Sequence, residues 1–137
     1  MNLTARKLTT TAGALALILG GGLAMAPTAS AAQVAYNGAC GTGYKVIRSV
    51  PMSTFGTGYL TYSSATGNNC VVIMNGTGTA QYMSARIVAS NGGTVQEDYG
   101  YFTSYAGPVY YYAPGQCVDW GGLIDQYYRW VENDACG

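Results

Sequence analysis

The chain has 137 residues, of which 9% are charged and none is histidine, and its formal net charge is zero. Without an imidazole it cannot form a Ser-His-Asp or Cys-His catalytic site. The part that follows Ala31 keeps four cations and six anions, a net charge of −2, without a basic cluster. Binding to nucleic acids and anionic membranes depends on Lys and Arg side chains that neutralise phosphate charges. We therefore exclude both as partners.

Residues 1–31 are predicted to be a secretory signal peptide. Two basic residues precede an apolar run of small residues (12–26), and an A-x-A step follows at 29–31. The apolar run is shorter than the ~20 residues that span a bilayer, which disfavours the alternative of an uncleaved membrane anchor. We expect cleavage after Ala31 or the next residue, leaving one extracellular domain at 32–137 with no membrane segment.

Short runs rich in Val, Ile, Thr and Tyr follow one another from Tyr44 onward, with turn residues every eight to twelve positions. This spacing predicts an all-β fold, a small antiparallel β-sandwich or barrel of seven or eight short strands. The residues before Cys40 are expected to be a short flexible lead-in. Strands are predicted at 44–50, 57–63, 69–74, 80–89, 94–104, 108–113, 116–120 and 127–132. Turns are predicted at 64–69, 75–78, 90–93, 113–116 and 121–125.

Side-chain alternation separates the two faces of the predicted strands. In the strand at 80–89, one face is predicted to be core, with the residues Met83, Ala85, Ile87 and Ala89. In the strand at 108–113, alternation places Val109, Tyr111 and Ala113 on one face and Tyr110 and Tyr112 on the other. Either other elements cover this second face, or it presents tyrosine to solvent.

Four cysteines follow the signal peptide: Cys40, Cys70, Cys117 and Cys136. In a small exported domain they predict two disulfides. Three pairings are possible and the sequence leaves them open, although we favour Cys40 with Cys70 and Cys117 with Cys136. A zinc site is disfavoured because the chain has no C-x-x-C pair and no histidine. We expect no metal and no cofactor.

Carboxylates are the remaining candidates for catalysis, namely Glu97, Asp98, Asp119 and Asp125. A glycoside hydrolase needs two carboxyl groups that face each other across a sugar, but no spacing here is diagnostic of such a pair. For Asp119 we favour a structural role, as acceptor for the glycine amides of the following turn or as partner of an arginine. We predict no catalytic residue and no enzymatic activity.

Aromatic residues are the more suggestive feature. Thirteen tyrosines are more than a two-layer domain of this size can hide, and a contiguous exposed patch of them would mark an interaction site. The surface candidates are Tyr105, Tyr110, Tyr112, Trp120 and Trp130. For the two tryptophans, the core is the favoured alternative.

Four stretches resemble a known family. They are "AYNGACGTGYKVI" at 35–47, "YLTYSSATGNNCVV" at 59–72, "YFTSYAGPVYYYAPGQCVDWGG" at 101–122 and "VENDACG" at 131–137. Together they resemble the spore-associated protein A family of filamentous actinobacteria, over essentially the whole chain that follows the signal peptide. The resemblance implies a small secreted protein found with spores, and it carries no catalytic motif.

We therefore expect a secreted, non-enzymatic protein that is retained at the spore or cell surface, where it contacts spore-coat or cell-wall components through weakly charged aromatic side chains. The first alternative is a carbohydrate- or peptidoglycan-binding module, which would bind a defined glycan saturably through stacked aromatic rings. The second is a secreted inhibitor of a hydrolase, which would present a rigid loop such as "SATGNN" at 64–69.

Overall fold

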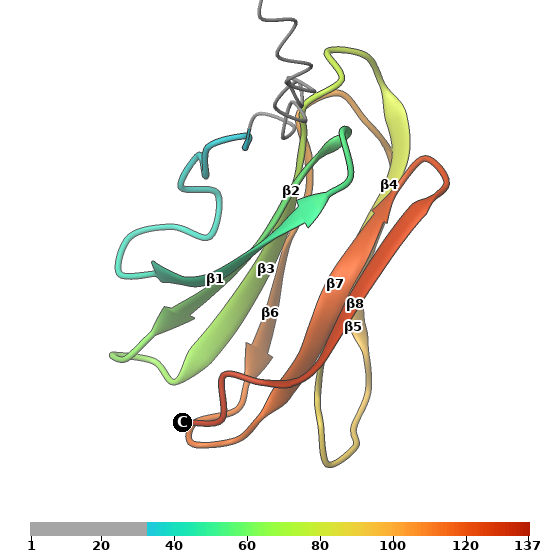
Figure 1. Ribbon diagram of the computed structural model, residues 1–137. Coiled ribbons are helices and arrows are strands. Elements are labelled where there is room, and N and C mark those ends of the chain that lie inside the picture. Colours follow the sequence, from blue (N-terminus) through green and yellow to red (C-terminus); the bar gives the residue numbers. More distant parts are fainter. Residues whose placement is uncertain (1–32) are drawn as a thin grey trace, which may run out of the picture.

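Eight antiparallel strands form two stacked four-stranded sheets in the computed structural model, which describes residues 33–137 (Figure 1). The strands are β1 (Lys45–Met52), β2 (Gly56–Ser63), β3 (Asn68–Asn75), β4 (Gln81–Ala89), β5 (Gln96–Phe102), β6 (Tyr105–Tyr112), β7 (Val118–Ile124) and β8 (Tyr127–Asp134). The predicted signal peptide lies outside the described residues. Within 33–137, no helix is long and apolar enough to cross a membrane.

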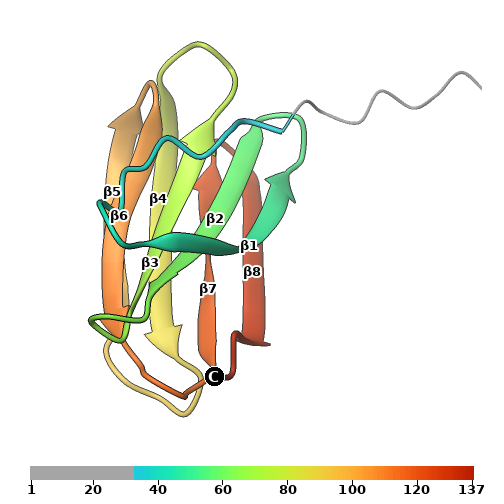
Figure 2. The ribbon, with the colours of Figure 1, turned by 90° about the vertical axis from the view of Figure 1, so that its left-hand side faces the viewer.

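The first sheet has the strand order β1-β2-β3-β6, and the second has the order β5-β4-β7-β8. The consecutive strands β5 and β6 belong to different sheets and lie next to each other along one side of the molecule (Figure 2). The predicted all-β architecture is thus confirmed, as a sandwich of two sheets.

The core lies between the two sheets, and its residues follow the alternation of the strands. Trp120 on β7 is fully buried at its centre, and the face of β4 predicted to be core is buried as predicted. The other buried apolar residues of this cluster are Met52, Leu60, Val71, Ile73, Ala106, Val109, Ala113, Val118 and Ile124. Packing of the two sheets stabilises the fold by about 25 cal/mol for each Å² of apolar surface that it removes from water.

Both predicted disulfide pairings are confirmed. Cys40 bonds to Cys70 on β3, and Cys117 bonds to Cys136 near the C-terminal end of the chain. The first disulfide holds the segment before β1 against the first sheet. The second ties the loop before β7 to the segment after β8.

The predicted turn at 121–125 is wrong, because Gly121 and Gly122 belong to strand β7 and the turn begins only at Asp125. The physical reason is close packing. A Cβ atom at Gly122 would collide with the backbone oxygen of Ser84 on the neighbouring strand and would press on Ile73 from the opposite sheet. Glycine inside a strand marks such a close approach as often as it marks a turn.

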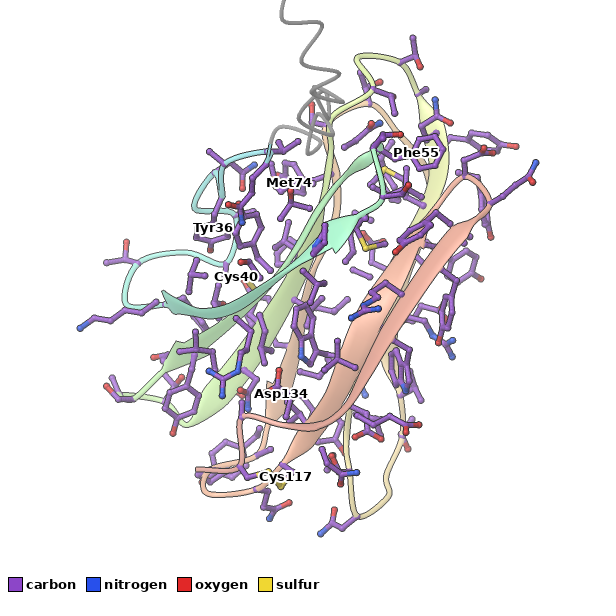
Figure 3. All side chains as sticks on the ribbon, in the orientation of Figure 1. Tyr36, Cys40, Phe55, Met74, Cys117 and Asp134 are labelled. Carbon is purple, nitrogen blue, oxygen red and sulfur yellow. A yellow bond between two sulfur atoms is a disulfide. The ribbon has the colours of Figure 1, made fainter. Side chains whose placement is uncertain are left out.

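The predicted flexible lead-in is instead an ordered N-terminal strap, residues 33–44, which crosses the outer face of the first sheet (Figure 2). The Val34 amide donates a hydrogen bond to Thr57 Oγ1 at 3.0 Å, and the Tyr110 hydroxyl donates one to the Cys40 carbonyl oxygen at 3.0 Å. Figure 3 shows Tyr36 and Cys40 of the strap beside this sheet. Composition alone did not indicate this because the strap is held by contacts distant in sequence.

An apolar surface on β2 and β3 explains why the strap is ordered. Tyr59, Val72 and Met74 point away from the sandwich core and form a second buried cluster with the Cys40–Cys70 disulfide. The Tyr59 hydroxyl donates to the Val34 carbonyl oxygen. Burial raises the pKa of Tyr59 and also that of Tyr110, so both phenols stay neutral over the ordinary pH range.

Candidate functional site

The outer face of the second sheet is the largest concentration of exposed aromatic rings in the described chain. We call it the aromatic face and define it by five residues: Tyr82, Tyr99, Tyr101, Tyr128 and Trp130. Their exposed fractions are 77% for Tyr101, 64% for Tyr99, 51% for Tyr128 and 40% for Tyr82, with Trp130 half-buried. No other described segment covers this side of the molecule, whereas the strap covers the opposite side (Figure 1).

Strand pairing brings these residues together from three strands. Tyr82 on β4 lies opposite Tyr101 on β5, and their rings meet edge to face with centroids 5.4 Å apart. Tyr128 and Trp130 are two positions apart on β8, so they share a face, and their rings are parallel to within 12° with centroids 6.3 Å apart. Paired neighbours across an antiparallel sheet also share a face, which makes the five residues one surface.

Arg86 lies in the row of the second sheet's outer face that ends at Trp130. It pairs with Gly121 on β7, which pairs in turn with Trp130 on β8. Because Gly121 has no side chain to fill the middle of this row, the Arg86 guanidinium reaches to 5.7 Å from the centroid of the Trp130 ring. A cation at this position is attracted by the ring, by about 0.5–1 kcal/mol at an exposed site.

The polar groups of Arg86 are only partly paired. Its Nε atom is 3.2 Å from Glu97 Oε1, but the angle does not suit a hydrogen bond, and this buried Nε has no other partner among the described residues. Both side chains are about one third exposed, so the ion pair itself contributes little to stability. The guanidinium therefore retains donors for a bound molecule.

The five predicted surface candidates lie in different parts of the structure and do not form one site. Only Trp130 belongs to the aromatic face, so its predicted place in the core is wrong. Trp120 has no exposed surface and is corrected to a core residue, as its alternative stated. Tyr105 packs half-buried against the cluster beneath the strap, and Tyr110 holds the strap through its hydroxyl. Tyr112 is 68% exposed on β6 of the first sheet, away from the aromatic face.

Sequence reasoning missed four members of the aromatic face: Tyr82, Tyr99, Tyr101 and Tyr128. One signal was available, since the alternation that placed Met83 in the core also placed Tyr82 outside it. In "QEDYGYF" at 96–102, the same alternation separates the two tyrosines from the inward Phe102. The sequence does not show that β4 pairs with β5 and that β7 pairs with β8, and this pairing is what brings the four tyrosines onto one face.

The four candidate carboxylates do not gather in one site. Glu97 belongs to the aromatic face region, and Asp98 on the opposite side of β5 accepts a hydrogen bond from the Gly107 amide at 2.7 Å. Asp125 occupies the turn after β7. Asp119 accepts hydrogen bonds from the Ser90 hydroxyl and from the Asn133 amide, at 2.9 Å for the latter. Its structural role is as expected, but its partners differ from the glycine amides or arginine that we predicted.

Residues 75–77 (Asn-Gly-Thr) match the N-x-T acceptor pattern for N-glycosylation, and their side chains take part in the fold. The Asn75 side chain is buried, and its Nδ2 atom donates to the Thr79 oxygen at 2.8 Å and to the Phe102 oxygen at 3.0 Å. Both amide hydrogens are thus used. Attachment of a glycan at this nitrogen would require the hydrogen bonds to break.

A cavity of about 470 Å³ lies at one end of the sandwich, between β1 and the C-terminal segment. Its lining is mainly apolar or backbone, with Arg48, Tyr62 and Asn69 as the polar side chains. Arg48 is engaged by Asp134, with its Nε atom 2.8 Å from Oδ1. Among residues 33–137, no cluster of His, Cys, Asp or Glu is arranged to hold a metal ion.

Asp134 is the most highly coordinated carboxylate near this cavity. Its Oδ2 accepts a hydrogen bond from the buried Trp120 Nε1 at 3.0 Å, and its Oδ1 accepts from the Ala135 amide at 2.8 Å as well as from Arg48. Burial alone would raise the pKa of Asp134, but these hydrogen bonds and the positive charge of Arg48 outweigh it and lower that pKa. The labelled Asp134 in Figure 3 marks this position between the ends of the two sheets.

Comparison with known proteins yields a relative that aligns with most of the chain. The chain is 49% identical over 129 residues to spore-associated protein A of Streptomyces coelicolor, an alignment that covers 90% of this chain and 84% of the relative. The chain belongs to the spore-associated protein A family. This confirms the resemblance found in the four quoted stretches. No family model and no solved structure matches the chain.

Proposed function

We propose that this protein is exported and stays attached to the spore or cell surface as a non-enzymatic structural or interaction protein, and that the aromatic face makes the attachment. The name of its relative supports the association with spores. The observation that carries the proposal is the contrast between the two sheets. One outer face is covered by the strap, and the other leaves its aromatic rings uncovered.

The free energies of ring burial and of association explain why attachment needs several aromatic rings and not one. Full burial of a large apolar side chain contributes roughly 1.5–3 kcal/mol, whereas association costs at least ~4 kcal/mol of lost freedom. A lone exposed ring such as Tyr112 cannot offset that cost. Five neighbouring rings can, even if each is only partly buried at the contact.

The low charge of the chain favours attachment through aromatic rings over attachment through ion pairs. The chain after the signal peptide has a net charge of −2, and the aromatic face has Arg86 as its cation, already beside Glu97. Attachment would then resist salt, because salt screens charges and does not weaken apolar contacts. Its partners would be spore-coat or cell-wall components that present apolar or amphipathic surfaces.

The test is fractionation of a sporulating culture into medium, hyphal wall and spores, with washes of salt, free sugars and mild detergent. We expect the protein on spores, resistant to salt and released by detergent. The triple variant Tyr99→Ser, Tyr101→Ser, Tyr128→Ser should appear in the medium with its fold intact. Tyr112→Ser, equally exposed but on the other sheet, is the matched control and should remain on spores. Retention of the triple variant would contradict the proposal.

A further inference from the structure

We infer that the aromatic face binds a neutral, extended polysaccharide, with sugar rings stacked on Tyr128 and Trp130 and sugar hydroxyls held by Arg86 and Glu97. The inference rests on the proposed attachment through this face and specifies the chemical class of its partner. Three independent features of the surface lead to it: the geometry of the rings, the unused hydrogen-bonding groups and the sign of the charge.

The ring geometry suits a chain of sugars. A pyranose has apolar C–H groups on its faces and hydroxyls at its rim, so it stacks on an aromatic ring while its rim remains polar. Tyr128 and Trp130 lie on the same face of β8 and are parallel within 12°. Two aromatic side chains in a row along a strand can contact successive units of an extended polymer, and aromatic rings of this kind combine an apolar body with a polar edge.

The polar groups suit hydroxyls. The Arg86 guanidinium has five N–H donors, and it makes no well-oriented hydrogen bond with the described residues, although Glu97 Oε1 is 3.2 Å from its Nε atom. A sugar hydroxyl both donates and accepts, so one hydroxyl can accept from Arg86 and donate to Glu97. Such a bridge would use the exposed Nη donors of Arg86 beside the Trp130 ring, because the Nε atom itself is buried.

The charge decides which polymer fits. The outer face of the second sheet holds one cation, Arg86, and three anions, Glu97, Asp119 and Glu132. A phosphate- or carboxylate-rich polymer would meet net repulsion there, since recognition of polyanions requires clustered Lys and Arg. A neutral polymer meets no such cost. We therefore commit to a neutral polysaccharide, and a polyanion becomes an outcome of the test.

The two tryptophans make the test direct. Trp120 is fully buried, so its emission reports on the fold, while Trp130 reports on the aromatic face. Cellohexaose and chitohexaose, both flat β-linked oligosaccharides, are titrated separately, with inorganic polyphosphate as the anionic comparison. We expect saturable protection of the Trp130 emission from acrylamide quenching with at least one of the two oligosaccharides, and none with polyphosphate.

Variants locate the site. Calorimetric titration should show Tyr128→Ser and Arg86→Lys weakening the oligosaccharide by about tenfold or more, which corresponds to ~1.4 kcal/mol. The Lys variant keeps the charge and loses the planar set of donors. Tyr112→Ser, outside the face, should bind as the original protein does. If Tyr128→Ser fails to fold, Tyr99→Ser tests the same face with a residue that is 64% exposed.

The outcomes separate this inference from the proposed function. Absence of saturable binding to both oligosaccharides at millimolar concentration would overturn the inference, and so would binding that none of the face variants weakens, or a preference for polyphosphate. If the triple tyrosine variant still leaves the spore in that case, attachment through the aromatic face stands and the partner is another surface. If that variant stays on the spore, the proposed function itself is wrong.

Discussion

Replacement of Asp134 by Asn tests how the buried tryptophan is held. The carboxylate accepts from three donors, the Trp120 indole, the Arg48 guanidinium and the Ala135 amide. An asparagine offers one acceptor oxygen and one NH₂ group, so it must turn a donor toward at least one of these donors. The change keeps the size of the side chain, removes the charge and replaces one acceptor oxygen by an NH₂ donor.

The expected cost follows from the exposure of each partner. A hydrogen bond to a charged group contributes about 1.5–3 kcal/mol, and a buried donor left unpaired costs about 1–3 kcal/mol. Trp120 is fully buried and carries most of this cost, whereas Arg48 is half exposed, so its ion pair contributes under ~1 kcal/mol. We expect Asp134→Asn to lower the free energy of unfolding by about 2–3 kcal/mol, or Tm by roughly 10–20 °C.

The pH dependence has a definite sign. Because the pKa of Asp134 is lowered in the folded protein, the unfolded chain binds the proton more readily. The stabilisation is therefore fully present above the unfolded value of about 3.9 and is lost as the pH falls through the lower folded pKa. The difference between the original protein and Asp134→Asn should be constant near neutral pH and should shrink in acid.

The difference in the free energy of unfolding between the two proteins is measured by urea unfolding at several pH values, with tryptophan emission as the signal. The matched control is Asp125→Asn, the same chemical change in the exposed turn after β7, where φ is 54° and Asn is accommodated. That control should stay within about 0.5 kcal/mol of the original protein. Equal stability of the two variants, or a difference that does not shrink in acid, would refute the assigned role of Asp134.

Three further predictions concern the strap and the core. Replacing both Cys40 and Cys70 by Ser should lower the free energy of unfolding by about 3–4 kcal/mol, because the disulfide closes a 30-residue separation; denaturant unfolding measures it, and an unchanged midpoint would contradict it. Tyr110→Phe should cost about 1 kcal/mol and speed hydrogen exchange in residues 33–44 while leaving β4 unaffected; equal exchange in the strap would show that the hydroxyl does not hold it. Gly122→Ala should lower Tm by roughly 10 °C or more, since its Cβ would collide with the Ser84 carbonyl oxygen; a calorimetric scan close to that of the original protein would exclude the collision.

The two tryptophans show why the site was only partly predictable. Both occur in strands, and residue type alone favoured the core for both. In the sheet, Trp130 on β8 lies opposite Gly121 on β7, which is the residue next to Trp120. Because neighbouring residues of a strand point to opposite faces, the two tryptophans lie on opposite faces of the sheet. Register between strands is set by contacts distant in sequence, and a shift of one residue reverses every side chain. The sequence could not reveal it.

Local patterns did determine much of this protein. The period of two in the strands, the core face at 83–89 and the pairing capacity of four cysteines in a small domain are properties of short segments, and the structure confirms the two disulfides and the sandwich. Turn chemistry located most strand ends for the same reason. It failed at Gly121 and Gly122 because their neighbours come from β4 and β8.

Only the tertiary structure decided which tyrosines face solvent. The strap covers the first sheet because β2 and β3 present Tyr59, Val72 and Met74 outward, a fact that depends on how those strands pair. The aromatic face exists because β5 and β8 flank β4 and β7 in one sheet. Alternation assigns a side chain to one of two faces, but which face is covered depends on segments far away in the sequence.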